Sequence, residues 1–249
     1  MRLVEQNGRR YATFENPIWQ RGLVHAFATR PLDVGMRADG RSSQRLANRQ
    51  AMARDLGLDP SRLHCCVQVH RPRLVRVAQP EGRDYPDTDG LLTDISGVGL
   101  MVFSADCPLL LLYDPLRRAL GVAHASWRCT MADIAGRLVA QMAAAFGCRP
   151  ADLHAGIGPS AGPQNYEVGS DVYAAAAGLP DREACFRRVG GKLYFDLWQA
   201  NRQQLEAAGL EPPNIETAGL CTMERSDLFY SFRREGAGCG HFGLLAALA

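Results

Sequence analysis

The sequence predicts an α/β protein of the α+β type, a single layered domain in which mixed β-sheets are flanked by helices. Short apolar runs recur through the first half of the chain, as expected of buried strands. One pair of runs flanks an Asp-Pro turn and predicts an antiparallel hairpin, and longer amphipathic segments follow it. Hairpins mixed with helices favour mixed sheets over a purely parallel, doubly wound sheet.

Length and composition agree with that class. The 249 residues fall between one and two typical domains, and because no linker or repeat interrupts them we expect one domain over residues 1–249. The hydrophobic fraction of 47% and the charged fraction of 22% are those of an ordinary globular protein. The net charge is only +2 and the arginine pairs are dispersed, so we expect no nucleic-acid partner.

The sequence predicts neither a membrane segment nor a secretion signal. Its longest apolar stretch is far shorter than the roughly 20 residues of a membrane helix, and its first residues lack the apolar region of a signal peptide. We therefore expect a cytoplasmic protein without a membrane partner. In that compartment the eight cysteines are expected to be reduced thiols rather than disulfides.

The strands are expected where apolar residues cluster between turn residues. In chain order, the predicted strands cover residues 23–28, 66–69, 74–78, 98–103, 109–113 and 118–123.

Three helices are predicted from apolar periodicity and from residues that begin or end helices. Gly57 ends the first and Gly209 ends the third, while Thr130 and Asp133 have the spacing of a capping box in the second. A stretch rich in Pro, Gly, Asp and Arg, residues 30–43, leads into the first helix as a loop. In chain order, the predicted helices cover residues 44–56, 130–146 and 197–208.

The predicted hairpin turns at Asp114-Pro115, where Pro fixes φ and Asp accepts backbone hydrogen bonds. If the loop is residues 114–117, the residue numbers of each antiparallel pair sum to 231. That register places Cys107 opposite His124 on one face of the sheet.

Candidate functional side chains stand where predicted strands give way to turns. His70, Cys107 and His124 each occupy such a position, from which a rigid scaffold commonly presents functional groups. Imidazole and thiol groups bind soft metals, and a Cys beside a His can also act as a nucleophile. On the residues alone, a metal site, a Cys–His nucleophile and ordinary structural residues all remain open.

A second candidate feature is the beginning of the helix predicted over residues 130–146. Arg128 and Thr130 lie there, where free N–H groups and the helix dipole favour an anion. An arginine beside such a site suits phosphate or carboxylate. The alternative is an ordinary capped helix with a surface arginine.

Two segments together resemble the YfiH-type family, also called multicopper polyphenol oxidase (laccase-like) and peptidoglycan editing factor, and viewed as purine nucleoside phosphorylase-like. The first is Asp106-Cys107-Pro108 before an apolar strand, and the second is Gly121-Val122-Ala123-His124-Ala125-x-Trp127-Arg128. The resemblance extends from about residue 24 to the C-terminus. Supporting segments are Gln68-Val69-His70, Thr88-Asp89-Gly90-Leu91-Leu92-Thr93, Gly158-Pro159-Ser160-Ala161-Gly162-Pro163, Tyr166-Glu167-Val168-Gly169, Asp196-Leu197-Trp198, Cys221-Thr222 and Ser231-Phe232-Arg233-Arg234.

The resemblance implies a metal site of His70, Cys107 and His124, usually zinc, in a single-domain α/β fold. Two nitrogen donors and one sulfur donor suit tetrahedral Zn²⁺ with a fourth position open, as in catalytic zinc sites. The implied activities are phosphorolysis of adenosine, inosine, guanosine and methylthioadenosine, and hydrolytic deamination of adenosine. The implied partners are therefore a nucleoside and phosphate, bound by a monomer or a small homo-oligomer.

Within that hypothesis, Cys107 and His124 are the catalytic centre and Arg128 holds phosphate. Gln68 is a further candidate for substrate binding. The departing base needs an acid, and Asp106 and Glu167 are the candidates, with Glu167 also counted among the residues that bind substrate.

The chain departs from the usual pattern of the family at several positions. Ser126 and Cys129 stand where His-Ala-Gly-Trp-Arg-Gly has glycines, and Gln164-Asn165 replaces a Cys-Cys pair. Residues 31–34 shorten a Gly-Gly-Val-Ser segment, and His241 stands where Arg is usual.

Three other enzymatic functions remain open, as does a non-enzymatic scaffold if the departures above disable the site. In a metal-free cysteine hydrolase, Cys107 would be the nucleophile and His124 its activator. A peptidoglycan editing factor would hydrolyse a mischarged UDP-MurNAc-amino acid precursor. A copper-dependent polyphenol oxidase would use one copper at the same three residues, because six histidines without a His-x-His pair cannot supply the roughly ten of a laccase-type cluster.

Overall fold

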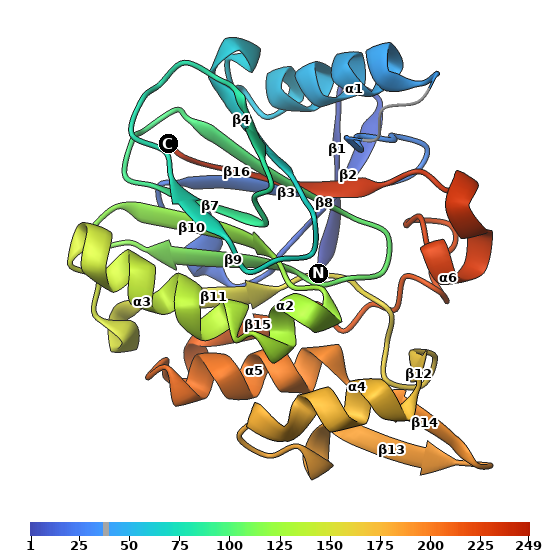
Figure 1. Ribbon diagram of the computed structural model, residues 1–249. Coiled ribbons are helices and arrows are strands. Elements are labelled where there is room, and N and C mark those ends of the chain that lie inside the picture. The colour runs from blue at the N-terminus through green and yellow to red at the C-terminus, as the bar shows by residue number, and fades with distance from the viewer. Residues whose placement is uncertain (37–39) are drawn as a thin grey trace.

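Two large β-sheets packed face to face form the centre of the molecule, and helices cover their outer faces (Figure 1). The computed structural model describes residues 1–36 and 40–249. Residues 37–39 of the predicted loop stretch 30–43 lie outside the described part.

Each large sheet mixes parallel and antiparallel pairs, as predicted. The seven-stranded sheet has the order β1 (Arg2–Gln6), β2 (Arg9–Thr13), β3 (Leu23–Ala28), β16 (Phe242–Leu248), β8 (Gly99–Ser104), β4 (Leu63–Val67), β6 (Asp84–Pro86). The six-stranded sheet has the order β15 (Ile215–Thr217), β11 (His154–Ile157), β9 (Leu109–Asp114), β10 (Ala119–His124), β7 (Gly90–Thr93), β5 (Leu74–Arg76). A small third sheet has the order β12 (Glu167–Val168), β14 (Lys192–Phe195), β13 (Phe186–Val189).

The helices build the outer layers. One packs on the outer face of the seven-stranded sheet, two pack on the six-stranded sheet, and the others are short. In chain order they are α1 (Ser42–Asp55), α2 (Trp127–Met131), α3 (Ile134–Phe146), α4 (Ser170–Ala175), α5 (Leu197–Ala207) and α6 (Phe232–Glu235).

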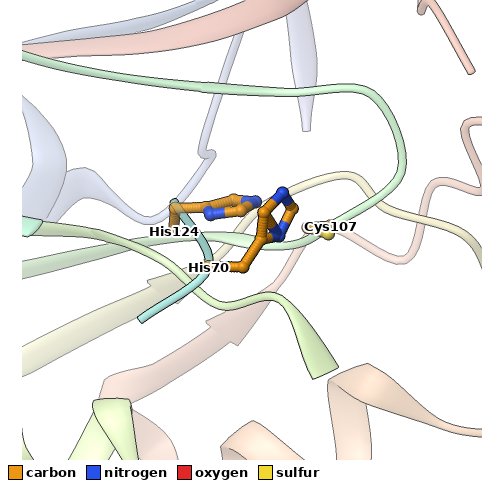
Figure 2. Close-up of side chains that lie close together, drawn as sticks. All are labelled: His70, Cys107 and His124. Carbon is orange, nitrogen blue, oxygen red and sulfur yellow. The ribbon is translucent and has the colours of Figure 1, made fainter. Parts of the chain in front are cut away.

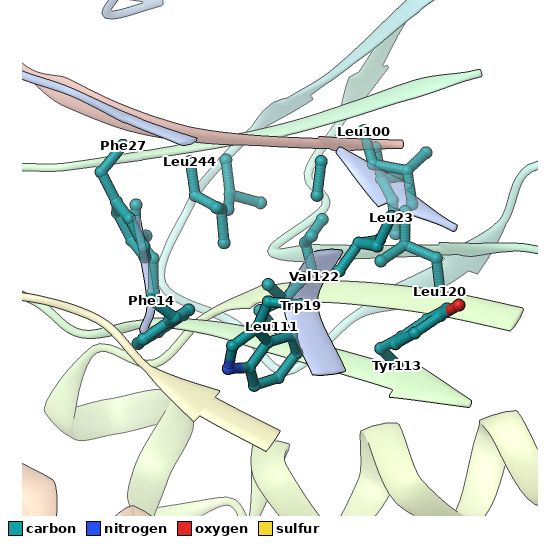
Figure 3. Packing of buried hydrophobic residues seen from close by; sticks show 14 of the residues in the cluster. Phe14, Trp19, Leu23, Phe27, Leu100, Leu111, Tyr113, Leu120, Val122 and Leu244 are labelled. Atoms are coloured by element: carbon teal, nitrogen blue, oxygen red, sulfur yellow. The ribbon is translucent and has the colours of Figure 1, made fainter. Parts of the chain in front are cut away.

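The main core lies between the two large sheets, because alternate residues of each strand point to opposite faces. On β9, Leu111 points into this core and Leu112 points toward α3 and α5. Both faces of β9 are therefore buried, which explains its continuous apolar run. Gly121 on β10 allows α3 to pack closely, since an added Cβ would lie 3.0 Å from Leu138. Figure 3 shows the core, with Leu100 and Leu244 facing Leu111 and Val122 across the sheets.

The predicted strands and the first and third helices all overlap observed elements, with boundaries that differ by a few residues. The helix predicted over residues 130–146 is instead broken into α2 and α3. Ser126 caps α2 and Asp133 caps α3, and the left-handed backbone of Asp133 (φ 57°) separates them. The predicted capping box is therefore wrong. Thr130 lies inside α2 and donates its hydroxyl to a backbone carbonyl, so it offers no site at a helix N-terminus.

The hairpin loop lies one residue later than predicted. Asp114 pairs with Ala119, so partner numbers sum to 233 instead of 231. The Asp114 carboxylate accepts hydrogen bonds from the backbone amides of Leu116 and Arg117, both at 2.9 Å, which keeps Asp114 as the last paired residue. Arg118 then closes the loop with a φ of 50°.

The corrected register places Leu109 opposite His124. The prediction that Cys107 is the strand partner of His124 is therefore wrong. Cys107 lies just before β9, in the connection from β8, and reaches His124 from the end of the strand.

No helix in the described part of the chain is long and apolar enough to span a membrane. All eight cysteines are free thiols.

Candidate metal centre

Three side chains that sequence analysis singled out meet at one end of the two large sheets (Figure 2). His70 follows β4, Cys107 lies between β8 and β9, and His124 is the last residue of β10. One ligand atom from each lies within 4.8 Å of the other two, somewhat more than the roughly 4 Å expected of a closed site. His70 is exposed, Cys107 is partly buried and His124 is buried, so the cluster opens to solvent on the His70 side.

Asp89, between β6 and β7, fixes the position of both histidines. Its carboxylate lies 2.9 Å from His124 Nδ1 and accepts a bond from the backbone amide of His70 at 3.1 Å. Because a carboxylate can only accept, Nδ1 of His124 carries the proton and Nε2 keeps its lone pair for a metal. The amides of Val69 and Arg71 also donate to Asp89, at 3.0 and 3.2 Å. These bonds hold the His70 turn, where φ is 60°.

The protonation equilibria follow from this packing. Burial alone would raise the pKa of Asp89, but the bond from His124 and those from backbone amides outweigh it and lower that pKa. Desolvation of the ring on the cavity wall and the neighbouring His124 lower the pKa of His70, which favours the neutral imidazole that binds metals. Burial and the nearby Asp106 carboxylate raise the pKa of the Cys107 thiol, so a bound cation is what favours its thiolate.

Asp106 holds the loop that carries Cys107. Its backbone has a φ of 107°, and its buried carboxylate accepts bonds from the Thr222 hydroxyl at 2.6 Å and the Arg233 amide at 2.7 Å. The Ser104 hydroxyl donates to the carbonyl of Cys107 at 2.7 Å. The loop is thus fixed from both sides, and Asp106 joins it to α6.

The cluster lies on the wall of a cavity of about 570 Å³, within the usual range for small-molecule sites. Arg128 reaches this cavity from α2, with its guanidinium 4.3 Å from the centre of the Trp127 ring. Gln68 also lines it, but both ends of its amide bond the backbone of Phe103, at 2.7 and 2.8 Å. Glu167 does not line this cavity. It borders an adjoining hollow and pairs with Lys192 at 2.8 Å.

Four of the residues that depart from the family pattern have contacts or positions that the structure defines. Ser126 accepts the backbone amide of Cys129 and caps α2, and the Cys129 thiol lies 3.8 Å from Asp89. Asn165 donates to Glu224 at 2.6 Å. His241 borders the metal-site cavity.

The donor set fits zinc, since two imidazoles and one thiol converge and one imidazole is oriented by a carboxylate. The fold and the site together define a mixed α/β protein with a three-residue candidate metal centre in a cavity of ligand size. Residues 20–249 match the family model described as multi-copper polyphenol oxidoreductase laccase, and the chain belongs to this laccase-like family.

The chain is also similar to proteins named for purine nucleoside phosphorolysis. A purine nucleoside phosphorylase of Deinococcus radiodurans is 36% identical over 237 residues, which cover 91% of this chain and 89% of the relative. The purine nucleoside phosphorylase YlmD of Bacillus subtilis is 32% identical over 214 residues, covering 82% and 77%.

Solved structures have the same fold. The crystal structure of YlmD from Geobacillus stearothermophilus superposes with a TM-score of 0.91 at 29% identity, covering 98% of each chain. That of Bacillus licheniformis YfiH gives a TM-score of 0.88 at 29% identity, covering 93% of this chain and 94% of the other.

Sequence reasoning gave no role to Asp89 or to Arg233, which also lines the cavity. Asp89 stands before the apolar strand β7, in the segment Thr88-Asp89-Gly90 that carries part of the family resemblance. Its contacts with the His70 turn and β10 come from tertiary packing. The one sequence signal that could have pointed to a role for Asp89 is its position directly before Gly90, at the start of a strand.

Proposed function

We propose that the protein is a zinc-dependent purine nucleoside phosphorylase that also deaminates adenosine. The observation that carries the proposal is the convergence of His70, Cys107 and His124 within 4.8 Å, on a cavity that Arg128 also lines. The names of the similar proteins support the substrate class. The nucleosides are adenosine, inosine, guanosine and methylthioadenosine. A panel of these nucleosides, assayed with and without phosphate, is the direct test.

His70, Cys107 and His124 would hold the zinc, which would supply Lewis acidity at this wall of the cavity. In phosphorolysis, a phosphate oxygen held by Arg128 attacks ribose C1′ as the bond to the base breaks. The electron pair leaves with the base, which takes a proton. Of the two predicted acids only Asp106 lines the cavity, but both of its carboxylate oxygens accept hydrogen bonds, from the Thr222 hydroxyl and the Arg233 amide. We therefore assign the proton to solvent water and give Asp106 the role of positioning the Cys107 loop. In deamination, water adds at C6 and ammonia leaves, giving inosine.

Replacing Arg128 with alanine is expected to weaken phosphorolysis far more than deamination, because only phosphorolysis brings in a phosphate dianion. One charge-assisted contact contributes about 1.5–3 kcal/mol, or roughly ten- to a hundred-fold in rate at low phosphate. Zinc should stay bound, since arginine has no lone pair to give a metal.

The matched control is Arg76→Ala. Arg76 is also exposed and packs on an aromatic ring, at 4.8 Å from the centre of Phe146, but it does not line the cavity. Both rates and bound zinc are measured for each variant. Equal losses of both activities in Arg128→Ala, with zinc retained, would contradict the phosphate assignment.

A second candidate is a cysteine hydrolase, the chemistry that a peptidoglycan editing factor could use on a mischarged UDP-MurNAc-amino acid precursor. The arrangement of three residues favours a cysteine hydrolase: the Asp89 carboxylate orients His124, which lies beside the Cys107 thiol. Activity that survives complete removal of metal would select this candidate. Elemental analysis of protein purified without added metal distinguishes zinc from the copper of a polyphenol oxidase.

We further propose a cytoplasmic location, which the eight free thiols support. The nucleoside and phosphate are the proposed small-molecule partners, and a monomer or small homo-oligomer is the proposed state. Light scattering after gel filtration tests the oligomeric state.

A further inference from the structure

Two arginine–aromatic pairs stand on the wall of the metal-site cavity. The Arg128 guanidinium lies 4.3 Å from the centre of the Trp127 ring, and the Arg233 guanidinium lies 4.7 Å from that of Tyr166. The pairs come from α2 and from α6 with the loop before β12, segments far apart in the sequence. Stacking on a ring restricts a guanidinium and presets the direction of its donors.

The same four residues also line an adjoining hollow of about 520 Å³. They therefore form a shared wall between the hollow and the metal-site cavity. An anion held by both arginines must lie on one side of this wall, and the carboxylates decide which.

On the side of the adjoining hollow, the exposed Asp171 would repel an anion, whereas Glu167 is paired with Lys192 at 2.8 Å. On the side of the metal-site cavity, the lining carboxylate among the described residues is Asp106. Its two oxygens already accept hydrogen bonds from Thr222 and from the Arg233 amide. The charge distribution therefore favours the side of the metal site.

Arg233 is well anchored for such a role. Its backbone amide donates to Asp106 at 2.7 Å, and its Nη1 donates to the carbonyl of Glu167 at 2.7 Å. A guanidinium has five N–H donors in a planar fork, so this bond leaves donors for a ligand. Asp106 is next to Cys107 in the chain, and thus one carboxylate sets both the Cys107 loop and the start of the Arg233 helix.

We propose that Arg128 and Arg233 hold one inorganic phosphate between them, on the metal side of the shared wall. The inference rests on the proposed function, in which phosphate is the attacking substrate, and it adds Arg233 as a second phosphate ligand. Two guanidinium forks match the oxygens of a tetrahedral oxyanion better than one does.

The test is calorimetric titration of zinc-loaded protein with inorganic phosphate. Arg233→Ala is expected to weaken phosphate binding by about ten- to a hundred-fold, as one charge-assisted contact implies. Arg233→Lys keeps the charge but loses the fork, so its affinity should lie between those of Arg233→Ala and the unmodified protein. In steady-state assays, Arg233→Ala should raise the KM for phosphate more than it lowers kcat.

The matched control is Arg187→Ala. Arg187 is also exposed, lies over a tyrosine ring at 5.2 Å and faces a backbone carbonyl, but it does not line the cavity. Its phosphate affinity should stay within about two-fold of the unmodified value, since surface changes away from a site have little effect. Arg233→Ala retains the backbone N–H that bonds Asp106, so its thermal unfolding and zinc content should match the control.

Two results would overturn the inference: no phosphate binding by the unmodified protein, or unchanged affinity in Arg233→Ala. Titration with a nucleoside 5′-monophosphate tests whether the bound anion is the phosphoryl group of a nucleotide and not free phosphate. Competition between it and free phosphate, with equal dependence on Arg233, would place the phosphoryl group of a nucleotide there instead. If phosphate binds through both arginines but no nucleoside is cleaved, the proposed function fails while the anion site stands.

Discussion

Replacing Cys107 with alanine is expected to remove the metal and abolish both phosphorolysis and deamination. Cys107 supplies the one sulfur atom of the cluster, and a thiolate is the strongest zinc ligand among its three residues. Losing an outer partner of a zinc ligand costs roughly 10–100-fold in affinity, and losing a ligand itself should cost more. Bound zinc, measured by elemental analysis, should fall from about one per chain to a small fraction.

The matched control is Cys66→Ala. Cys66 is also a buried thiol on the wall of the same cavity, but it is not part of the cluster. Its replacement should cost about 1 kcal/mol of unfolding free energy through the small void that it leaves, with zinc retained. Full zinc content in Cys107→Ala would refute the metal assignment. Loss of activity with zinc retained would instead support Cys107 as a nucleophile.

The second large effect is expected at Asp89. Its carboxylate accepts bonds from three backbone amides and from His124, at 2.9 to 3.2 Å. Asp89→Ala leaves these donors without their acceptor, at roughly 1–3 kcal/mol for each donor that water cannot reach. We therefore expect the free energy of unfolding in urea to fall by about 3–5 kcal/mol.

Asp89→Asn separates folding from metal binding, because the amide keeps the volume but has only one acceptor oxygen. Zinc affinity, measured by competition with a chelating dye, should fall about 10–100-fold. Asp94→Asn is the control, since Asp94 is half-exposed in a 3.4 Å pair with Arg76 and should contribute less than about 1 kcal/mol. An Asp89→Asn protein with unchanged zinc affinity would contradict the orienting role of Asp89.

The layered class and six of the sixteen strands in the described part of the chain could be predicted, among them β8, β9 and β10, which are buried throughout. The equally buried β16 was not predicted. The run over 109–113 is apolar throughout, and its neighbours carry the turn residues that bound it. The register of the β9–β10 hairpin was harder to predict, because it depends on a side chain that bonds the loop backbone. Asp114 does this and moves the loop by one residue.

The break between α2 and α3 could not be predicted either, because it too depends on the local conformation of one aspartate. Residues 130–146 have the periodicity of one helix, yet Asp133 adopts a left-handed conformation and begins a new one. The small third sheet was also missed, since its strands are only two to four residues long and just Leu193 and Phe195 of β14 are buried. Local pattern carries little information about such elements.

The three proposed metal ligands could be singled out from the sequence because each stands at or just beyond a strand end. Their orienting partner could not. Asp89 meets His124 because β7 pairs with β10, and it meets the His70 turn because β4 pairs with β6 and β5 pairs with β7. Arg233 likewise reaches the cavity through its bond to Asp106, 127 residues away in the chain.

The position of β16 has a consequence for how the chain is made. Among the described strands it is the last to be synthesised, yet it lies between β3 and β8 in the seven-stranded sheet. A nascent chain therefore carries two unjoined halves of this sheet, each with an open edge, until β16 emerges. During that interval the ribosome-bound chain is exposed to edge-to-edge pairing with other nascent chains. Chaperone binding during translation should accordingly centre on β3 and β8, and end when β16 emerges.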